Sequence, residues 1–223
     1  MTPNYIRTRN IFISSKLATS RDLFIFNKHK KWITNVYSRS RVHLLRANHD
    51  SILTTSKTIL KDNSTLNCRI DGLQKYSPKR FIIDKNLSIP INSKIIKTAN
   101  KISTYVFYNL IDNLKLEKLK QHKVKTIRID IKDNHLDFNK IILFLRNKGF
   151  YRVFVEAGIK FNNFLLENNY INDFYHFYSD ELFGYKNFHN AKSFLKKMNK
   201  IKRSKREIKI NLFQDKLIKY LIK

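Results

Sequence analysis

The alternation of strand-like and helix-like segments over residues 126–178 constrains the fold more than any other feature of this sequence. Three short runs are expected to be strands, namely 126–129, 151–155 and 172–178, and the second of them is nearly all apolar or aromatic. Between the first two runs, apolar residues at Phe138, Ile141, Ile142 and Leu145 follow the helical spacing i, i+3, i+4 and i+7. Strand, helix, strand, helix, strand is typical of parallel sheets, so we predict an α/β fold with a mostly parallel central sheet.

Single residues mark the expected ends of the two helices in this half. Asn134 is a candidate N-cap for the first helix, and Gly149 stands where a helix C-cap is expected. Gly158 opens the second helix, whose apolar residues Phe161, Phe164 and Leu165 face inward. The small-residue turn that leads into this helix exposes backbone N–H groups, which can form an anion site without a full glycine fingerprint.

The rest of the chain carries less regular signals. We expect strands at 11–18, 51–54, 80–84 and 104–108, a short helix at 38–47, a turn at 58–62 and a solvated linker at 114–122. Two edge strands are expected at 208–213 and 217–222. The predicted organisation is an N-terminal extension, 1–10, followed by a single domain over 11–223 with a basic segment at 196–206.

The charge of the chain suggests a different functional class. Lys and Arg number 45 against 17 Asp and Glu, which gives a formal net charge of +28. This balance favours a nucleic acid or another polyanion as partner. The alternative explanation is a compositional drift toward Lys, Asn and Ile, which would place lysines on every solvated face without any polyanion partner. No helix-turn-helix, zinc or RNA-binding signature accompanies the charge, which argues against nucleic-acid binding. A basic nucleic-acid-binding protein is therefore kept as the alternative hypothesis and not as the first one.

Composition excludes several common sites. The four glycines are spaced so that neither G-x-G-x-x-G nor G-x-x-x-x-G-K-[ST] can be written. Cys68 is the only cysteine, which excludes an internal disulfide and a multi-cysteine zinc site and predicts a small buried hydrophobe. The histidines lack H-x-E and H-E-x-x-H spacing, so we expect no metal site. No apolar run approaches the ~20 residues that span a bilayer, so we expect no membrane partner.

Charged residues at the ends of expected strands are the first candidates for chemistry. Glu156 and Asp84 each follow a strand, and Lys16 lies near the end of the first strand. Ligands of open α/β sheets bind beyond the carboxyl ends of the strands, and a carboxylate there is costly unless it is paired or solvated. Glu156 has an equally good structural reading as a group stabilised at a helix start. Trp32, the only tryptophan, is expected in the core.

Four arginines could bind phosphate through forked, charge-assisted hydrogen bonds. They are Arg39, Arg41, Arg46 and Arg69. The first two lie in the expected helix at 38–47, and a solvated helix face is the preferred reading for them.

Several short blocks, in order along the chain, resemble one known family. They include K-L-A-T-S-R-D at 16–22, W-I-T at 32–34, V-H-L-L-R-A at 42–47, P-K-R-F-I-I-D at 78–84 and V-F-V-E-A-G at 153–158. These blocks are similar to the reductase domain of the bacterial bifunctional riboflavin-biosynthesis deaminase-reductases, in one register over about residues 11–185. Several blocks in order are far more specific than any one of them.

The resemblance implies a dihydrofolate-reductase-like three-layer sandwich with helices on both faces of a mostly parallel sheet. It implies a cytoplasmic, NADPH-dependent reduction of 5-amino-6-(5-phosphoribosylamino)uracil to 5-amino-6-(5-phosphoribitylamino)uracil, with hydride delivered to C1 of the opened ribose. The phosphorylated pyrimidine is then the substrate. The family often dimerises, so a homodimer is expected, and a separate deaminase is a candidate partner.

The family's site residues carry over onto matching positions of this chain. The catalytic positions are Lys16, Asp62 and Glu156. The cofactor positions are Thr19, Trp32, Thr58, Asp62, Lys85, Gly158, Ile159, Lys160 and Phe161. The substrate positions are Lys30, Arg46, Leu66, Arg69 and Glu156. By this resemblance Lys16 could polarise the ring-opening oxygen or help hold the imine, and Glu156 could orient the ribose hydroxyls or relay a proton.

The chain also departs from the family. Leu23 replaces a glycine, Lys30 replaces a serine and Ala157 replaces a common glycine. With one cysteine the zinc deaminase domain of the bifunctional family is expected to be absent, so the chain would be a stand-alone reductase, a split gene product or a fragment. These departures keep two further alternatives open: a degenerate, non-catalytic partner of a separate deaminase, and a reductase for another pterin or pyrimidine.

Overall fold

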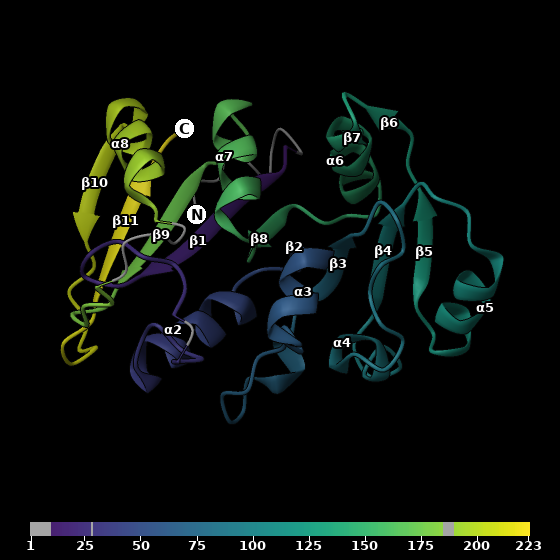
Figure 1. The fold of residues 1–223 in the computed structure, drawn as a ribbon, viewed down its shortest axis with the longest axis horizontal. Helices are drawn as coiled ribbons and strands as arrows, with labels where there is room; N and C mark the ends of the chain where they lie inside the picture. The colour runs from purple at the N-terminus through teal and green to yellow at the C-terminus, as the bar shows by residue number, and fades with distance from the viewer. Residues whose placement is uncertain (1–9, 28, 185–189) are drawn as a thin grey trace. The chain divides into compact units, whose positions relative to one another are not determined.

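The computed structural model describes residues 10–27, 29–184 and 190–223 (Figure 1). These residues fall into two compact units. Unit 1 contains 10–12 and 46–155, and unit 2 contains 13–45 and 156–223 apart from the positions that are not described. Each unit has its own strands and helices. The expected extension at 1–10 lies almost wholly outside the described residues, and the single domain over 11–223 stays a prediction.

Unit 1 is a parallel sheet with helices. Its strands are β2 (Ser51–Thr55), β3 (Lys79–Ile83), β4 (Thr104–Tyr108), β5 (Lys125–Arg128) and β8 (Arg152–Val155), with a small hairpin of β6 (Ile131–Lys132) and β7 (His135–Leu136). Its helices are α3 (Ser56–Asp62), the 3-10 turn η1 (Gln74–Tyr76), α4 (Lys94–Lys97), α5 (Asn113–Gln121) and α6 (Phe138–Asn147). The order β8-β2-β3-β4-β5 is parallel throughout.

Helices cover both faces of the unit 1 sheet. Phe81 pairs with Tyr105 across β3 and β4, so the two rings share a face and stack with centroids 4.5 Å apart. Phe144 of α6 packs edge-on against the ring of Phe107 on the same face, at 5.5 Å. The opposite face carries Arg80, whose side chain reaches the C-cap of α4. The expected parallel sheet with helices on both faces is therefore confirmed in unit 1.

Arg80 is a fully buried cation that joins three parts of unit 1. Its guanidinium donates to the hydroxyls of Thr104 and Thr98 at 2.6 to 2.9 Å and to the carbonyls of Thr65 and Ile102 at 3.0 and 2.9 Å. Burial lowers the pKa of Arg80 to about 10, so the group keeps its charge at neutral pH. The Thr65 contact anchors the loop that leads to Leu66 and Arg69.

Unit 2 has a mixed sheet. β1 (Phe12–Thr19) runs parallel to β9 (Asp173–Tyr178), β11 (Lys216–Leu221) runs antiparallel to β9, and β10 (Ser204–Glu207) is the edge strand beside β11. Its helices are α2 (Val36–Ala47), α7 (Ile159–Glu167) and α8 (Lys192–Ile201), and β1 and α2 each extend a little into unit 1. Ser15 and Phe174 share a face, because they are register partners. Ser15 bonds to Asn162 of α7 and Phe174 packs on Phe194 of α8, so both helices cover that face.

Two segments that lack a clear helical pattern are helices in the structure. Residues 58–62 belong to α3 rather than to a turn, and 114–121 belong to α5 rather than to a solvated linker. α5 forms because Asp112 caps it, accepting a bond from the Lys115 N–H at 2.9 Å, and because Leu119 is buried.

Several expected boundaries are also wrong. Asp137 caps α6 by accepting from the Asn139 N–H at 3.0 Å, whereas Asn134 lies in the β6–β7 turn with a φ of 65°. Gly149, with a φ of 80°, lies just past the end of α6 as expected. No strand forms at 208–213, because the register of β10 on β11 ends at Glu207 and Ile218 and leaves these residues as the connection. No helix within the described residues is long and apolar enough to cross a membrane.

His176 should make the stability of the protein depend on pH. Burial, helped by the positive charge of Lys205, lowers the pKa of His176 from 6.5 to about 4. Between these values the unfolded chain binds a proton that the folded chain does not, so the free energy of unfolding falls as the pH drops through this window. We expect a loss on the order of 2 kcal/mol between pH 7 and pH 5 from this group.

Urea unfolding at the two pH values measures this loss. His176→Gln, a neutral replacement, should be less stable at pH 7 but should show a flatter pH dependence. His29→Gln, which removes an exposed imidazole, is the matched control. An equally steep pH dependence in His176→Gln would show that other groups cause it.

Candidate functional site

Lys16 and Glu156 form an ion pair in unit 2. The Lys16 Nζ lies 3.6 Å from the Glu156 Oε2, and only 8% of the Glu156 side chain is exposed. Lys16 lies inside β1, and Glu156 lies three positions before Ile159, the first residue of α7. A carboxylate this buried needs a cation or hydrogen bonds to stay charged. The structure therefore brings together two of the three expected catalytic residues and gives each a partner of opposite charge.

The start of α7 follows directly and has the properties of an anion site. Gly158 is the N-cap with φ −68° and ψ 169°, and no side-chain hydrogen bond caps the helix. The backbone N–H groups of Ile159 and Lys160 have no acceptor inside the helix, because they belong to its first turn. A Cβ built on Gly158 would meet no atom within 4 Å, so the approach is open. The backbone here fits a phosphate group of a dinucleotide.

Asn162 holds this turn in place. Its side-chain amide donates to the carbonyls of Ala157 at 3.0 Å and Gly158 at 3.2 Å, while its oxygen accepts from the Ser15 hydroxyl of β1. Because Lys16 is the next residue on β1, one buried asparagine links the strand that carries Lys16 to the turn that follows Glu156. Phe161 stacks on Phe164 at 5.9 Å on the side of α7 that is only half-buried.

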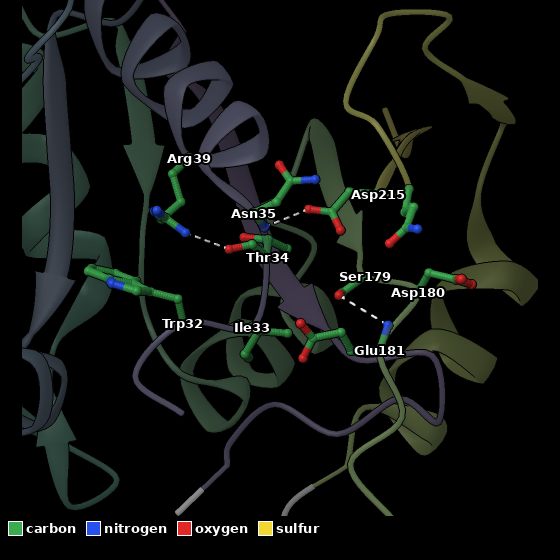
Figure 2. Close-up of a pocket in the computed structure, with 10 residues that line it drawn as sticks. Trp32, Ile33, Thr34, Asn35, Arg39, Ser179, Asp180, Glu181 and Asp215 are labelled. Atoms are coloured by element: carbon green, nitrogen blue, oxygen red, sulfur yellow. Dashed lines mark hydrogen bonds between the residues drawn. The ribbon is translucent and has the colours of Figure 1, made fainter. Parts of the chain in front are cut away.

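A pocket of about 280 Å³ lies elsewhere in unit 2 (Figure 2). It is lined by Trp32, Ile33, Thr34, Asn35, Arg39, Ser179, Asp180, Glu181, Gln214 and Asp215. Trp32 is 53% exposed, so its expected place in the core is wrong. Ser179, Asp180 and Glu181 follow the carboxyl end of β9, where ligands of parallel strands are found.

The acidic side of this pocket is partly neutralised. Lys30 reaches Glu181, with 2.6 Å between Nζ and Oε2, and Arg21 lies 3.9 Å from Asp180. Both ion pairs are exposed and therefore weak. Asp180, Glu181 and Asp215 were not identified as candidate site residues from the sequence. Asp180 and Glu181 lie just after a predicted strand, which was a local signal for them. Asp215 had none, because its partner Asn35 is 180 positions away.

Thr19 is more enclosed than a cofactor position suggests. Its side chain is fully buried and its hydroxyl bonds to the Nε2 of His176 at 2.9 Å. The Thr19 carbonyl accepts from the Ser179 N–H at 2.8 Å. Both polar groups are thus occupied within unit 2, and a role for Thr19 in cofactor binding stays a prediction.

Three expected substrate residues of unit 1 gather around Asn67. The Arg46 Nη1 donates to the Asn67 carbonyl at 2.9 Å, and the Arg69 Nη1 lies 3.3 Å from the Asn67 Oδ1. Leu66, the neighbour of Asn67, is buried with a φ of 51°, a left-handed conformation that is strained for leucine. Arg69 is exposed while Arg46 is buried, so Arg69 is the one that can turn toward a ligand.

The other expected residues of unit 1 follow neighbouring strands. The Thr58 hydroxyl lies 3.2 Å from that of Thr55, where β2 leads into α3, and Asp62 is the last residue of α3. Lys85 follows β3, and its Nζ donates to the carbonyl of Asn134 at 2.8 Å. Thr58 and Lys85 therefore lie near the carboxyl ends of adjacent parallel strands, as a ligand site of this fold requires.

Asp84 has a structural role instead. One carboxylate oxygen accepts from the N–H and hydroxyl of Ser88 at 2.9 and 2.7 Å, and the other accepts from the Ile89 N–H at 2.9 Å. The side chain is fully buried and holds the turn after β3. Cys68 is buried, as expected.

Comparisons with known proteins agree on one family. The family model described as the RibD C-terminal domain matches residues 12–208. A protein of Buchnera aphidicola subsp. Acyrthosiphon pisum named 5-amino-6-(5-phosphoribosylamino)uracil reductase is 33% identical over 160 residues, which cover 66% of this chain and 73% of that protein. The riboflavin biosynthesis protein RibD of Actinobacillus pleuropneumoniae is 24% identical over 183 residues, or 81% of this chain.

Solved structures show the same fold. Acinetobacter baumannii RibD matches 99% of this chain and 60% of its own, with a TM-score of 0.75 and 20% identity. The riboflavin biosynthesis reductase Rib7 of Saccharomyces cerevisiae matches 96% of this chain and 91% of its own, with a TM-score of 0.69 and 20% identity. The chain spans about half the length of several curated relatives, with 48% of the Actinobacillus protein covered.

Proposed function

Because this chain belongs to the RibD C-terminal domain family, we propose that it reduces 5-amino-6-(5-phosphoribosylamino)uracil to 5-amino-6-(5-phosphoribitylamino)uracil. The observation that carries the proposal is the ion pair between Lys16 and the buried carboxylate of Glu156, which shortly precedes the open N-terminus of α7. A charged pair supplies a proton donor and a proton acceptor, and the helix start supplies a place for a cofactor phosphate.

The reductant is NADPH in this proposal, and when bound it supplies the hydride that reduces C1 of the opened ribose. Two features of unit 2 support a phosphate-rich dinucleotide: the open backbone at Gly158 and the exposed Lys160 in the first turn of α7. Trp32 offers an exposed aromatic ring, which suits a planar heterocycle.

The chain's own residues have separate tasks. Lys16 stabilises the negative charge that develops on the ribose ring oxygen as the ring opens. Glu156 orients the ribose hydroxyls and relays a proton from the Lys16 ammonium to the opened sugar, and Lys16 regains its proton from solvent afterwards. Arg46, Leu66 and Arg69 form the substrate-binding group of unit 1, in which the two guanidinium groups recognise phosphate or uracil oxygens.

Arg69 gives a binding prediction. Its side chain is exposed, and two of its guanidinium hydrogen bonds within the protein are long, at 3.2 Å to the Thr65 hydroxyl and 3.3 Å to Asn67, so it can exchange these two bonds for bonds to a ligand oxygen. Arg69→Ala should weaken substrate binding by ~1.5–3 kcal/mol, the scale of a charged hydrogen bond. Isothermal titration of substrate measures this change, with Arg128→Ala, another exposed arginine of unit 1, as control. Unchanged affinity in Arg69→Ala would remove Arg69 from the site.

The activity itself is tested by nicotinamide absorbance. The purified chain is mixed with NADPH and the deaminated pyrimidine, which a separate deaminase makes in place. Loss of absorbance that needs both the chain and the pyrimidine would establish the reductase. No loss with NADPH still bound would point to another pterin or pyrimidine substrate. No loss and no binding of NADPH would favour a non-catalytic partner of a deaminase.

A further inference from the structure

The indole of Trp32 stands at the edge of the unit 2 pocket with a guanidinium above it. The Arg39 Cζ lies 5.1 Å from the ring centroid, within the range of a cation–π contact. The same guanidinium donates from Nη1 to the carbonyl of Thr34 at 2.7 Å (Figure 2). Arg39 therefore contacts the segment 32–34 twice, once on the ring of its first residue and once on the backbone of its last.

Arg39 comes from a part of α2 that is itself held firmly. Asn35 caps the helix by accepting from the Ser38 N–H at 3.0 Å, and its own amide donates to the Leu212 carbonyl at 2.6 Å. The buried Asp215 accepts from the Asn35 N–H at 2.8 Å and from the Ser38 hydroxyl at 2.7 Å. The base of Arg39 is thus fixed against the segment that precedes β11.

An exposed tryptophan without such a contact would sample several rotamers, and each binding event would have to select one of them. The bond to Thr34 limits where the guanidinium can go, and the guanidinium in turn covers one part of the indole. Lys31 also lies near the ring, with its Nζ at 5.4 Å from the centroid, but as its direct neighbour in the chain. Lys31 and Arg39 thus both place a positive charge near the indole. Of these two, Arg39 has the planar group and is hydrogen-bonded to the backbone of the pocket.

We propose that Arg39 is a positioning residue, which holds the Trp32 indole in one orientation so that the pocket receives a planar heteroaromatic ring. The inference rests on the proposed function, because the ring in question belongs to the nicotinamide dinucleotide. The proposal assigns a role to Arg39, for which the sequence predicts a solvated helix face.

The first experiment needs no ligand. Trp32 is the only tryptophan, so intrinsic tryptophan fluorescence reports on this ring alone. Arg39→Met should make the fluorescence easier to quench by acrylamide, with a Stern–Volmer constant raised about twofold, because the cover over the ring is lost. Arg39→Lys, which keeps the charge but not the planar fork, should fall between Arg39→Met and the wild type. Lys31→Met is the control and should quench like the wild type.

The second experiment measures NADPH binding through the fluorescence of NADPH itself. Arg39→Met should raise the dissociation constant about five- to tenfold and should change kcat less than twofold, because the ring is positioned before binding and not during the reaction. In a Trp32→Leu background the same Arg39→Met change should have no further effect, since Arg39 acts through the ring.

Several results would overturn the proposal. Equal quenching of Arg39→Met and the wild type, or an equal effect of Lys31→Met, would show that Arg39 does not hold the indole. An undiminished effect of Arg39→Met on NADPH binding in the Trp32→Leu background would show that Arg39 acts directly on the ligand. If the wild type fails to bind NADPH, the proposed cofactor is wrong, while the quenching comparison still decides whether Arg39 holds the ring. Circular dichroism of each variant confirms that it is folded.

Discussion

Glu156→Gln should lower kcat by a factor of about 10² to 10⁴, the range by which a positioned acid or base accelerates proton transfer. Glutamine has the shape of glutamate and can still hydrogen-bond, but it lacks the negative charge that pairs with Lys16 and cannot accept a proton and pass it on. The KM for the pyrimidine should stay within about threefold, because glutamine can still hydrogen-bond the ribose hydroxyls, whereas the proton relay that it lacks acts only in the transition state.

Glu167→Gln is the matched control for this experiment. Glu167 is the last residue of α7 and pairs with Lys197 on the surface, with 50% to 54% of each side chain exposed. Its replacement should leave kcat within twofold of the wild type, since surface ion pairs contribute little. Steady-state assays at saturating NADPH give both constants. Full turnover by Glu156→Gln would assign the buried carboxylate a purely structural role.

Arg80→Lys should reduce the free energy of unfolding by about 3 kcal/mol, because buried acceptors lose their donors. A lysine ammonium cannot reproduce the fork that reaches Thr104, Thr98, Thr65 and Ile102 together. It would remain a buried charge with fewer partners, which adds a desolvation cost. The carbonyl of Thr65 would lose its anchor as well, so substrate affinity should fall together with stability.

Urea denaturation measured at pH 7 tests the stability effect. Arg128→Lys, an exposed position on β5, should stay within about 0.5 kcal/mol of the wild type, as surface substitutions usually do. If Arg80→Lys is as stable as this control, water must replace the lost donors, and Arg80 is not the main link between the 65–69 loop and the sheet.

Local sequence signals were sufficient for most elements of the fold. The i, i+3, i+4, i+7 spacing at 138–145 predicted α6, and the apolar run at 151–155 predicted β8, because each pattern follows from the geometry of the element itself. The pattern was insufficient for α5. A mostly polar helix such as α5 shows little periodicity, and its formation depends on the Asp112 cap and on one buried leucine.

Candidate site residues were harder to identify from the sequence. A charged residue after a strand gives the same local pattern whether its side chain binds a ligand or stabilises a turn. Asp84 and Glu156 both follow buried strands. Asp84 binds its own turn through Ser88 and Ile89, whereas Glu156 pairs with a lysine of another strand. Only the fold separates the two cases, since the partner of Glu156 lies far away in the chain.

The sequence by itself determined the α/β class, the order of most strands and the family resemblance, since these depend on local patterns and on blocks of residues in order. Only the tertiary structure decided which side chains meet. It paired Lys16 with Glu156, gathered Arg46 and Arg69 around Asn67, and placed Arg39 over Trp32. The physical reason is that burial, charge pairing and ring contacts are properties of neighbours in space, and strand pairing and helix packing select those neighbours from remote parts of the chain.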